Sequence, residues 1–80
     1  MTEFDWKSRI SIKSSVCHGR PCIKGTRIWV SLILDLLASG NTIDDIQNEY
    51  PQIQKEDIQA CIAYGAEAAR EHFIQVAVER

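Results

Sequence analysis

The sequence predicts a mainly α-helical fold: a three-helix, helix-turn-helix-like bundle with a short N-terminal β element and a long C-terminal helix. Apolar residues recur at helical spacing in three stretches of residues 30–80, and glycine or proline separates the stretches. Polar and apolar residues alternate near the N-terminus. Eighty residues, 45% hydrophobic and 25% charged, are typical of a small globular protein. We expect residues 1–80 to form a single domain, with a basic strand-and-loop segment over 9–30 and a helical bundle over 30–80.

Two segments near the N-terminus favour β structure. Ile10 and Ile12 alternate with the polar residues around them over residues 9–13, which is the period of a strand with one buried face. Residues 26–30 (Thr-Arg-Ile-Trp-Val) are a second β-prone run. Together they predict the short β element that precedes the helices.

The first helix is predicted over residues 30–38 and is apolar nearly all round. One stripe has the spacing of a buried helix face: Val30, Ile33, Leu34 and Leu37. Leu32 and Leu36 extend the apolar surface to the opposite side. A chain of 80 residues has little core with which to cover both faces. We therefore place this helix at a dimer seam or at the centre of the bundle, and expect a homodimer.

The second helix is predicted between a glycine stop and a proline stop. Gly40 suits a left-handed C-terminal stop for the first helix. Thr42 can cap the next helix together with Asp45, three residues on. Pro51 ends this helix after about two turns. Its buried edge is expected to comprise Ile43, Ile46 and Tyr50.

The third helix is predicted to begin near Glu56 and Asp57, because carboxylates favour the positive end of a helix dipole. It is expected to run to the C-terminus, with one apolar stripe made of Ile58, Ile62, Ala66, Ala69, Phe73 and Val76. Small residues would let a neighbouring helix approach closely: Ala60, Ala63, Gly65 and Ala68.

Charge is divided unevenly along the chain, although the net charge is only −2. Residues 6–34 contain six basic and no acidic residues, whereas residues 35–80 contain nine acidic and three basic residues. Such an asymmetry favours the binding of an anionic partner by the basic half. The alternative interpretation is that these charges are scattered over the surface and only keep the protein soluble.

The basic half contains a loop whose turns are set by Gly19, Pro21 and Gly25. The residues expected to bind a partner or nucleic acid are Arg9, Lys13, Arg20, Lys24, Thr26 and Arg27. Two interpretations of Arg27 stay open. Its guanidinium could be free for bidentate contacts with carboxylate or phosphate, or it could be paired with an acid of the other half.

Several classes of site are disfavoured. Cys17, His18 and Cys22 lack the Cys-x-x-Cys spacing of common zinc sites, so no metal and no cofactor are expected. Neither a phosphate-binding loop nor a nucleophile with an orienting carboxylate is recognisable, so we expect no enzyme. Apolar runs are too short to span a membrane, and no signal peptide is apparent. An odd number of cysteines and the absence of a leader predict a cytoplasmic protein.

Residues 19–28, Gly-Arg-Pro-Cys-Ile-Lys-Gly-Thr-Arg-Ile, resemble the signature of a bacterial and archaeal family catalogued as domain of unknown function 433. The similarity continues to about residue 70 through Leu34, Leu37, Gly40, Ile46, Tyr50-Pro51, Glu56-Asp57-Ile58, Ala60 and Tyr64. The resemblance implies a homeodomain-like helix-turn-helix fold. It also implies an antitoxin of a type II toxin–antitoxin pair, encoded beside a toxin of the PIN-nuclease type. One departure is Gln54, where relatives favour Ser or Thr as a helix cap.

The expected function is therefore a non-enzymatic antitoxin-like regulator. PIN-type nucleases hold divalent metal with carboxylates, so Arg and Lys of the loop could bind that anionic pocket, or could instead bind operator phosphates. A helix that entered DNA from Lys55 would begin with Lys55, Glu56, Asp57 and Gln59. Two carboxylates there disfavour phosphate binding. The alternative function is a dimeric protein-interaction module with no DNA or nuclease partner.

Overall fold

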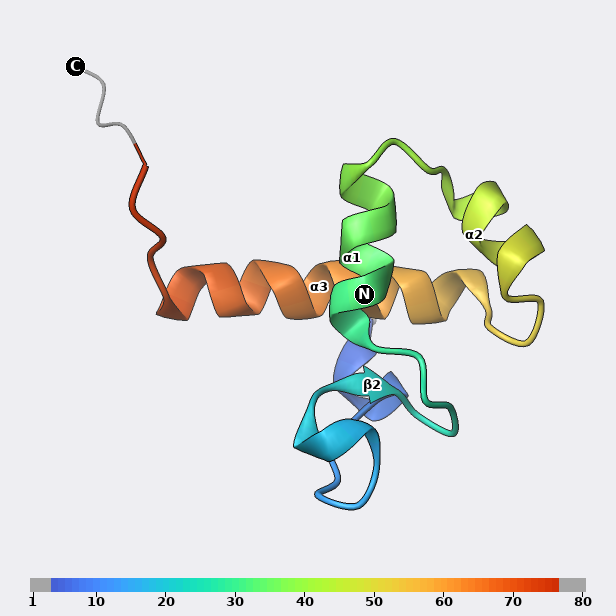
Figure 1. Cartoon of the computed structure of the whole chain (residues 1–80), viewed down its shortest axis with the longest axis horizontal. Helices are drawn as coiled ribbons and strands as arrows, with labels where there is room; N and C mark the ends of the chain where they lie inside the picture. Colours follow the sequence, from blue (N-terminus) through green and yellow to red (C-terminus); the bar gives the residue numbers. More distant parts are fainter. Residues whose placement is uncertain (1–3, 77–80) are drawn as a thin grey trace.

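The computed structural model describes residues 4–76 and confirms the predicted fold class (Figure 1). Three α-helices follow a small N-terminal sheet, and the third helix is the longest. The elements in chain order are the 3₁₀ turn η1 (Trp6–Arg9), β1 (Ile10–Ser11), the turn η2 (Cys17–Gly19), β2 (Cys22–Ile23), α1 (Val30–Ala38), α2 (Ile43–Glu49) and α3 (Lys55–Glu71).

The β element is an antiparallel pair in which Ile10 lies opposite Ile23 and Ser11 opposite Cys22. The second strand is thus β2, and the predicted β run over residues 26–30 forms only an isolated antiparallel bridge, from Trp29 to Cys22. That run turns back onto β2, since Ile23 donates its backbone N–H to the Ile28 carbonyl at 2.9 Å. Ile10 and Ser11 are both half-buried and Ile12 is 60% exposed, so the expected alternation of buried and exposed positions is not found.

Helix α1 occupies the centre of the bundle, and its predicted bounds are confirmed. Val30 and Ile33 are buried, and three leucines pack against the same core: Leu34, Leu36 and Leu37. Leu32 is 37% exposed. Of the two predicted settings for this helix, the structure shows the centre of the bundle. The homodimer stays a prediction.

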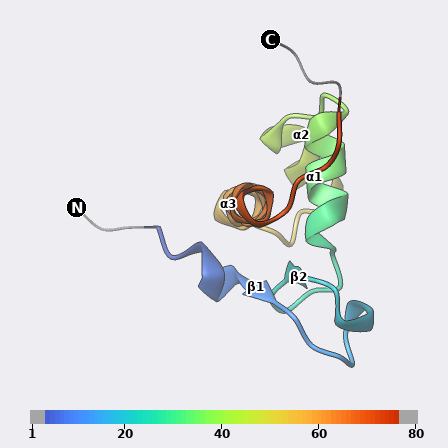
Figure 2. The same ribbon diagram turned by 90° about the vertical axis from the view of Figure 1, so that its left-hand side faces the viewer.

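Helices α1 and α3 cross closely at a glycine (Figures 1 and 2). A Cβ atom on Gly65 would lie 3.1 Å from Cδ1 of Leu34, which is tighter than normal packing. The predicted close approach of a helix to the small residues of α3 is confirmed at this point. The crossing closes one side of the core.

The turn between α1 and α2 has the predicted caps. Gly40 has φ +101°, and its N–H donates to the Leu37 carbonyl, while the Asn41 N–H donates to the Leu36 carbonyl. These bonds form a Schellman motif. Asp45 donates its N–H to the Thr42 hydroxyl and accepts from the Thr42 N–H, which completes a capping box at the start of α2. Hydrogen bonds from Thr42 lower the pKa of the Asp45 carboxyl below its usual value.

The predicted apolar stripe of α3 was wrong beyond its first residue. Ile58 and Cys61 are fully buried, whereas Ile62 is 45% exposed. The core-facing line continues through Gly65, one helical turn after Cys61, because α1 crosses there. The helix also ends earlier than expected. His72 is its C-terminal cap with extended backbone angles, and Phe73 is 94% exposed.

The N-terminal segment packs against α3 (Figure 2). Trp6 meets Tyr64 edge to face, with ring centroids 6.1 Å apart. Arg9 Nη1 donates to the Asp57 carboxylate at 3.0 Å and to the Gln54 side-chain oxygen at 3.1 Å. Asp57 also accepts the Gln54 backbone N–H at 2.8 Å. The Asp57 carboxylate thus supplies the N3 half of a capping box, which satisfies the Gln54 N–H, whereas a Ser or Thr at position 54 would accept an N–H of the first turn.

None of the helices within residues 4–76 has the length and apolar character needed to cross a lipid bilayer.

Candidate functional site

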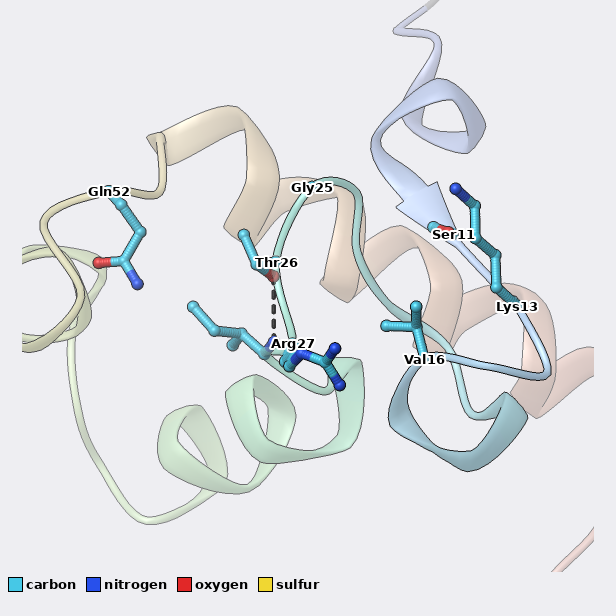
Figure 3. Close-up of a pocket in the computed structure, with 8 residues that line it drawn as sticks. Ser11, Lys13, Val16, Gly25, Thr26, Arg27 and Gln52 are labelled. Carbon is cyan, nitrogen blue, oxygen red and sulfur yellow. Dashed lines mark hydrogen bonds between the residues drawn. The ribbon is translucent and has the colours of Figure 1, made fainter.

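The turn after β2 is held by a threonine and a glycine. Gly25 has φ +81°, the left-handed region that L-residues with a Cβ avoid. The Thr26 hydroxyl donates to the Ile23 carbonyl at 2.7 Å and accepts the Ile28 N–H at 3.0 Å, the bond drawn in Figure 3. The Thr26 hydroxyl therefore stabilises the turn, and the turn fixes the backbone position from which the Arg27 side chain extends.

The loop between the two strands contains three consecutive residues with positive φ: Cys17 at +54°, His18 at +55° and Gly19 at +76°. A non-glycine residue in this region costs about 1–2 kcal/mol. Gly19 and Arg20 each donate a backbone N–H three residues back, to Val16 and Cys17. Such strain persists only where surrounding contacts enforce it, and it is concentrated at functional loops.

The turn after β2 borders a hollow of about 590 Å³, to which the positive-φ turn Cys17–Gly19 contributes no lining residue (Figure 3). It is lined by Ser11, Lys13, Val16, Gly25, Thr26, Arg27, Ile28 and Gln52. We call it the basic hollow. In Figure 3 the Arg27 guanidinium extends toward Val16, while Lys13 lies across from it, beside Ser11.

Electrostatics make the basic hollow suited to an anion. Lys13 and Arg27 are both exposed and form no ion pair within residues 4–76, where the pairs are Arg9–Asp57 and Arg70–Glu67. The predicted alternative, in which Arg27 pairs with an acid, is therefore absent from the described residues. The Ser11 hydroxyl and Gln52 amide add uncharged hydrogen-bonding groups. Two cations with such neighbours can bind a carboxylate or a phosphate.

The six predicted binding residues do not form one surface. Lys13, Thr26 and Arg27 line the basic hollow. Arg20 instead lies over the Trp29 ring, with its Cζ 5.0 Å from the ring centroid. Arg9 forms an ion pair with Asp57 and does not line the basic hollow. Lys24 is exposed at the tip of the turn, and its backbone N–H donates to the Arg9 carbonyl at 2.9 Å.

Sequence reasoning missed two polar residues of the basic hollow. Ser11 could have been found, since alternation in a strand places it on the same side as Lys13. Gln52 lies in the turn after α2 and reaches the basic hollow only through the fold, so no local pattern indicates it.

Burial disfavours the thiolate form of two cysteines, Cys22 and Cys61, because it raises their pKa values. Burial is the main cause that raises the pKa of the Cys22 thiol, and its interactions with Cys17 raise it further. The positive charges of Arg27 and Lys13 act in the opposite direction and lower this pKa. Burial and the nearby Asp57 raise the pKa of Cys61 to about 12. Reactive and metal-binding cysteines need the thiolate. Residues 4–76 also contain no group of three metal-binding side chains.

Arg27 is expected to contribute little to folding. Replacing Arg27 with Ala should shift the melting temperature by no more than about 2–4 °C, since exposed substitutions usually change stability by under about 0.5 kcal/mol. Arg9→Ala is the matched comparison, because it removes the same side chain from an ion pair, and it should lower the melting temperature more. Thermal denaturation followed by circular dichroism measures both. Equal losses would show that Arg27 is part of the scaffold.

Comparisons with known proteins agree with this architecture. The sequence pattern described as "Protein of unknown function (DUF433)" matches residues 10–65. The crystal structure of a DUF433 member protein from Anabaena variabilis ATCC 29413 superposes with a TM-score of 0.73 at 27% sequence identity. The match covers 79% of this chain and 62% of that one. None of the curated proteins compared with the chain matches it.

Proposed function

The chain belongs to the DUF433 family, and we propose that within it this member is a non-enzymatic, antitoxin-like regulator that binds and neutralises a PIN-type nuclease. On this proposal the protein is cytoplasmic and homodimeric. The observation that carries the proposal is that Lys13 and Arg27 both line the basic hollow and neither has a carboxylate partner among residues 4–76.

The chemistry of such a nuclease supports this choice of partner. An active site that holds Mg²⁺ or Mn²⁺ does so with several carboxylates, which repel one another when the metal is absent. A guanidinium can bind one carboxylate through two parallel hydrogen bonds, and an ammonium can add a point charge beside it. Arg27 and Lys13 would then occupy the place of the metal and hold the nuclease inactive.

The lining of the basic hollow favours binding over catalysis. Ser11, Thr26 and Lys13 supply hydroxyl and amine groups, but the described lining residues include no carboxylate, histidine or thiol that could act beside them as a general base. The cations there are suited to attracting a charged partner and orienting it.

Operator DNA is the weaker of the two proposed partners. The first turn of α3 presents Glu56 to solvent, and Asp57 beside it is engaged by Arg9. Affinity for duplex DNA comes largely from basic residues near phosphates. DNA binding would therefore depend on the basic N-terminal segment and not on α3, and it stays a prediction of the sequence.

The test uses the reading frame beside the gene, if its product has the spaced Asp and Glu residues of a PIN-type nuclease. That product is purified with Mn²⁺, and cleavage of a fluorescent RNA is measured with increasing amounts of this chain. Wild-type protein should inhibit stoichiometrically. The double variant Lys13→Ala, Arg27→Ala should require at least about tenfold more protein, because two charge-assisted contacts are lost.

Arg70→Ala is the matched control, since Arg70 is an exposed arginine of α3 whose pair with Glu67 lies outside the basic hollow. It should inhibit like wild type. Equal inhibition by the double variant would refute the assignment of the basic hollow. A dimeric chain that neither binds nor inhibits the neighbouring product would favour the alternative, a dimeric protein-interaction module with no DNA or nuclease partner.

A further inference from the structure

A second hollow lies at the crossing of α1 and α3 and differs sharply from the basic hollow. It has a volume of about 160 Å³ and is almost wholly apolar. Its lining includes Pro21, Val30, Leu34, Gly65 and Ala68, with Arg20 at its edge. We call it the apolar groove. Water in such a groove has few hydrogen-bonding partners, so an apolar side chain would displace it favourably.

The segment after α3 carries apolar side chains that contact little of the rest of the chain. Phe73 is 94% exposed, Ile74 88% and Val76 73%. These residues follow His72, where the backbone becomes extended with φ −132° and ψ 140°. Figure 1 shows this segment leaving the end of α3 and running away from the helices. We call residues 72–76 the apolar tail.

The local sequence keeps the apolar tail from folding back onto its own groove. Ala68 of the apolar groove lies only four residues before His72, so a return would need a tight reversal immediately after α3. Residues 72–76 contain no glycine or proline, and two of them are β-branched, which favours extended backbone. In an extended segment Ile74 and Val76 share one side.

The chain exposes more surface than a compact monomer of its mass would. Its accessible surface is 6330 Å², whereas a compact monomer of 9.1 kDa exposes roughly 4,900 Å². A standard protein interface buries about 800 Å² on each partner. The excess of roughly 1,400 Å² is thus enough for one such interface, and the exposed apolar tail contributes to it.

We propose that the apolar tail of one copy lies in the apolar groove of a second copy, with Ile74 and Val76 inserted between Leu34 and Ala68. The exchange is reciprocal about a two-fold axis, so each copy gives a tail and receives one. This inference rests on the homodimer in the proposed function and identifies its contact surface. The basic hollow shares no lining residue with the apolar groove, so the exchange does not use its side chains.

Sedimentation equilibrium of the full-length chain at about 10–100 μM tests the exchange. Wild type should have twice the mass of 9.1 kDa. The variant Ile74→Asp, Val76→Asp should raise the dimer dissociation constant at least tenfold, because charges replace the inserted side chains. Ser31→Glu should do the same from the groove side. Ser31 lines the groove and is exposed near the N-terminus of α1, where an acid does not oppose helix formation.

Ala38→Glu is the control, since Ala38 is exposed at the other end of α1 and should leave the dimer intact. A mixture of the tail variant and Ser31→Glu should form a heterodimer with one intact tail-and-groove pair, tighter than either variant alone. A dimeric tail variant would refute the exchange but leave the homodimer. A monomeric wild type at 100 μM would refute both, and RNA cleavage still tests the basic hollow separately.

Discussion

Replacing Ile58 with Ala should be the most damaging single change considered for this protein. Ile58 is fully buried, in the core that α1, α2 and α3 share. Truncation of a buried Ile to Ala costs about 2–5 kcal/mol, because packing is lost and a cavity remains. In a domain of this size each kcal/mol lowers the melting temperature by about 4–8 °C. We therefore expect a drop of at least about 8 °C in calorimetry.

Ile62→Ala is the matched control, since it removes the same atoms from the same helix one turn later. Ile62 is 45% exposed, so its truncation loses little packing. Alanine has a higher helix propensity than isoleucine, and this gain largely offsets the lost packing. Its free energy of unfolding should change by less than about 1 kcal/mol. Comparable losses at the two positions would show that both face the core and that α3 is rotated from its described orientation.

Asp57→Ala should produce the second large loss of stability. Its carboxylate caps the Gln54 N–H at 2.8 Å and binds Arg9 at 3.0 Å. Removal leaves the Gln54 N–H without its acceptor and Arg9 without its carboxylate partner, at a cost of about 1–3 kcal/mol. Urea denaturation followed by tryptophan fluorescence reports the change, because Trp6 lies beside α3.

Two comparisons make this prediction specific. Glu56→Ala removes an exposed acid from the same helical turn and should cost less than about 1 kcal/mol, through the helix dipole alone. In a double-mutant cycle, Arg9→Ala and Asp57→Ala should be non-additive by at least about 0.5 kcal/mol. Additive effects would mean that the ion pair contributes nothing and that the cap alone explains the loss.

The parts of the fold that could be predicted from the sequence are those with local causes. Helix α1 has the bounds predicted from its apolar residues, and Gly40, Thr42 and Asp45 form the expected caps around the next turn. Each of these features depends on residues only a few positions apart. Their hydrogen bonds form within one or two turns of chain, so the sequence pattern is sufficient to identify them.

The parts that could not be predicted depend on contacts between distant segments. The buried face of α3 is set by where α1 crosses it, and Ile62 is exposed although it satisfies the helical period as well as Cys61 does. The same applies to the candidate site. Nothing in the sequence indicates that Arg9 pairs with a residue 48 positions away, or that Gln52 lines the same hollow as Arg27. Charge alone could not show that Arg9 forms an ion pair whereas Arg27 has no carboxylate partner among residues 4–76.

The contact between the N-terminal segment and α3 has a consequence for where the structural unit begins. The family pattern starts at residue 10, but Trp6 and Arg9 precede it and both contact α3. A fragment trimmed to residues 10–65 would lose the aromatic contact with Tyr64 and the partner of Asp57, and it would end within α3. The region that a family pattern recognises is therefore smaller than the region that packs together, and fragments of this chain need to begin before Trp6.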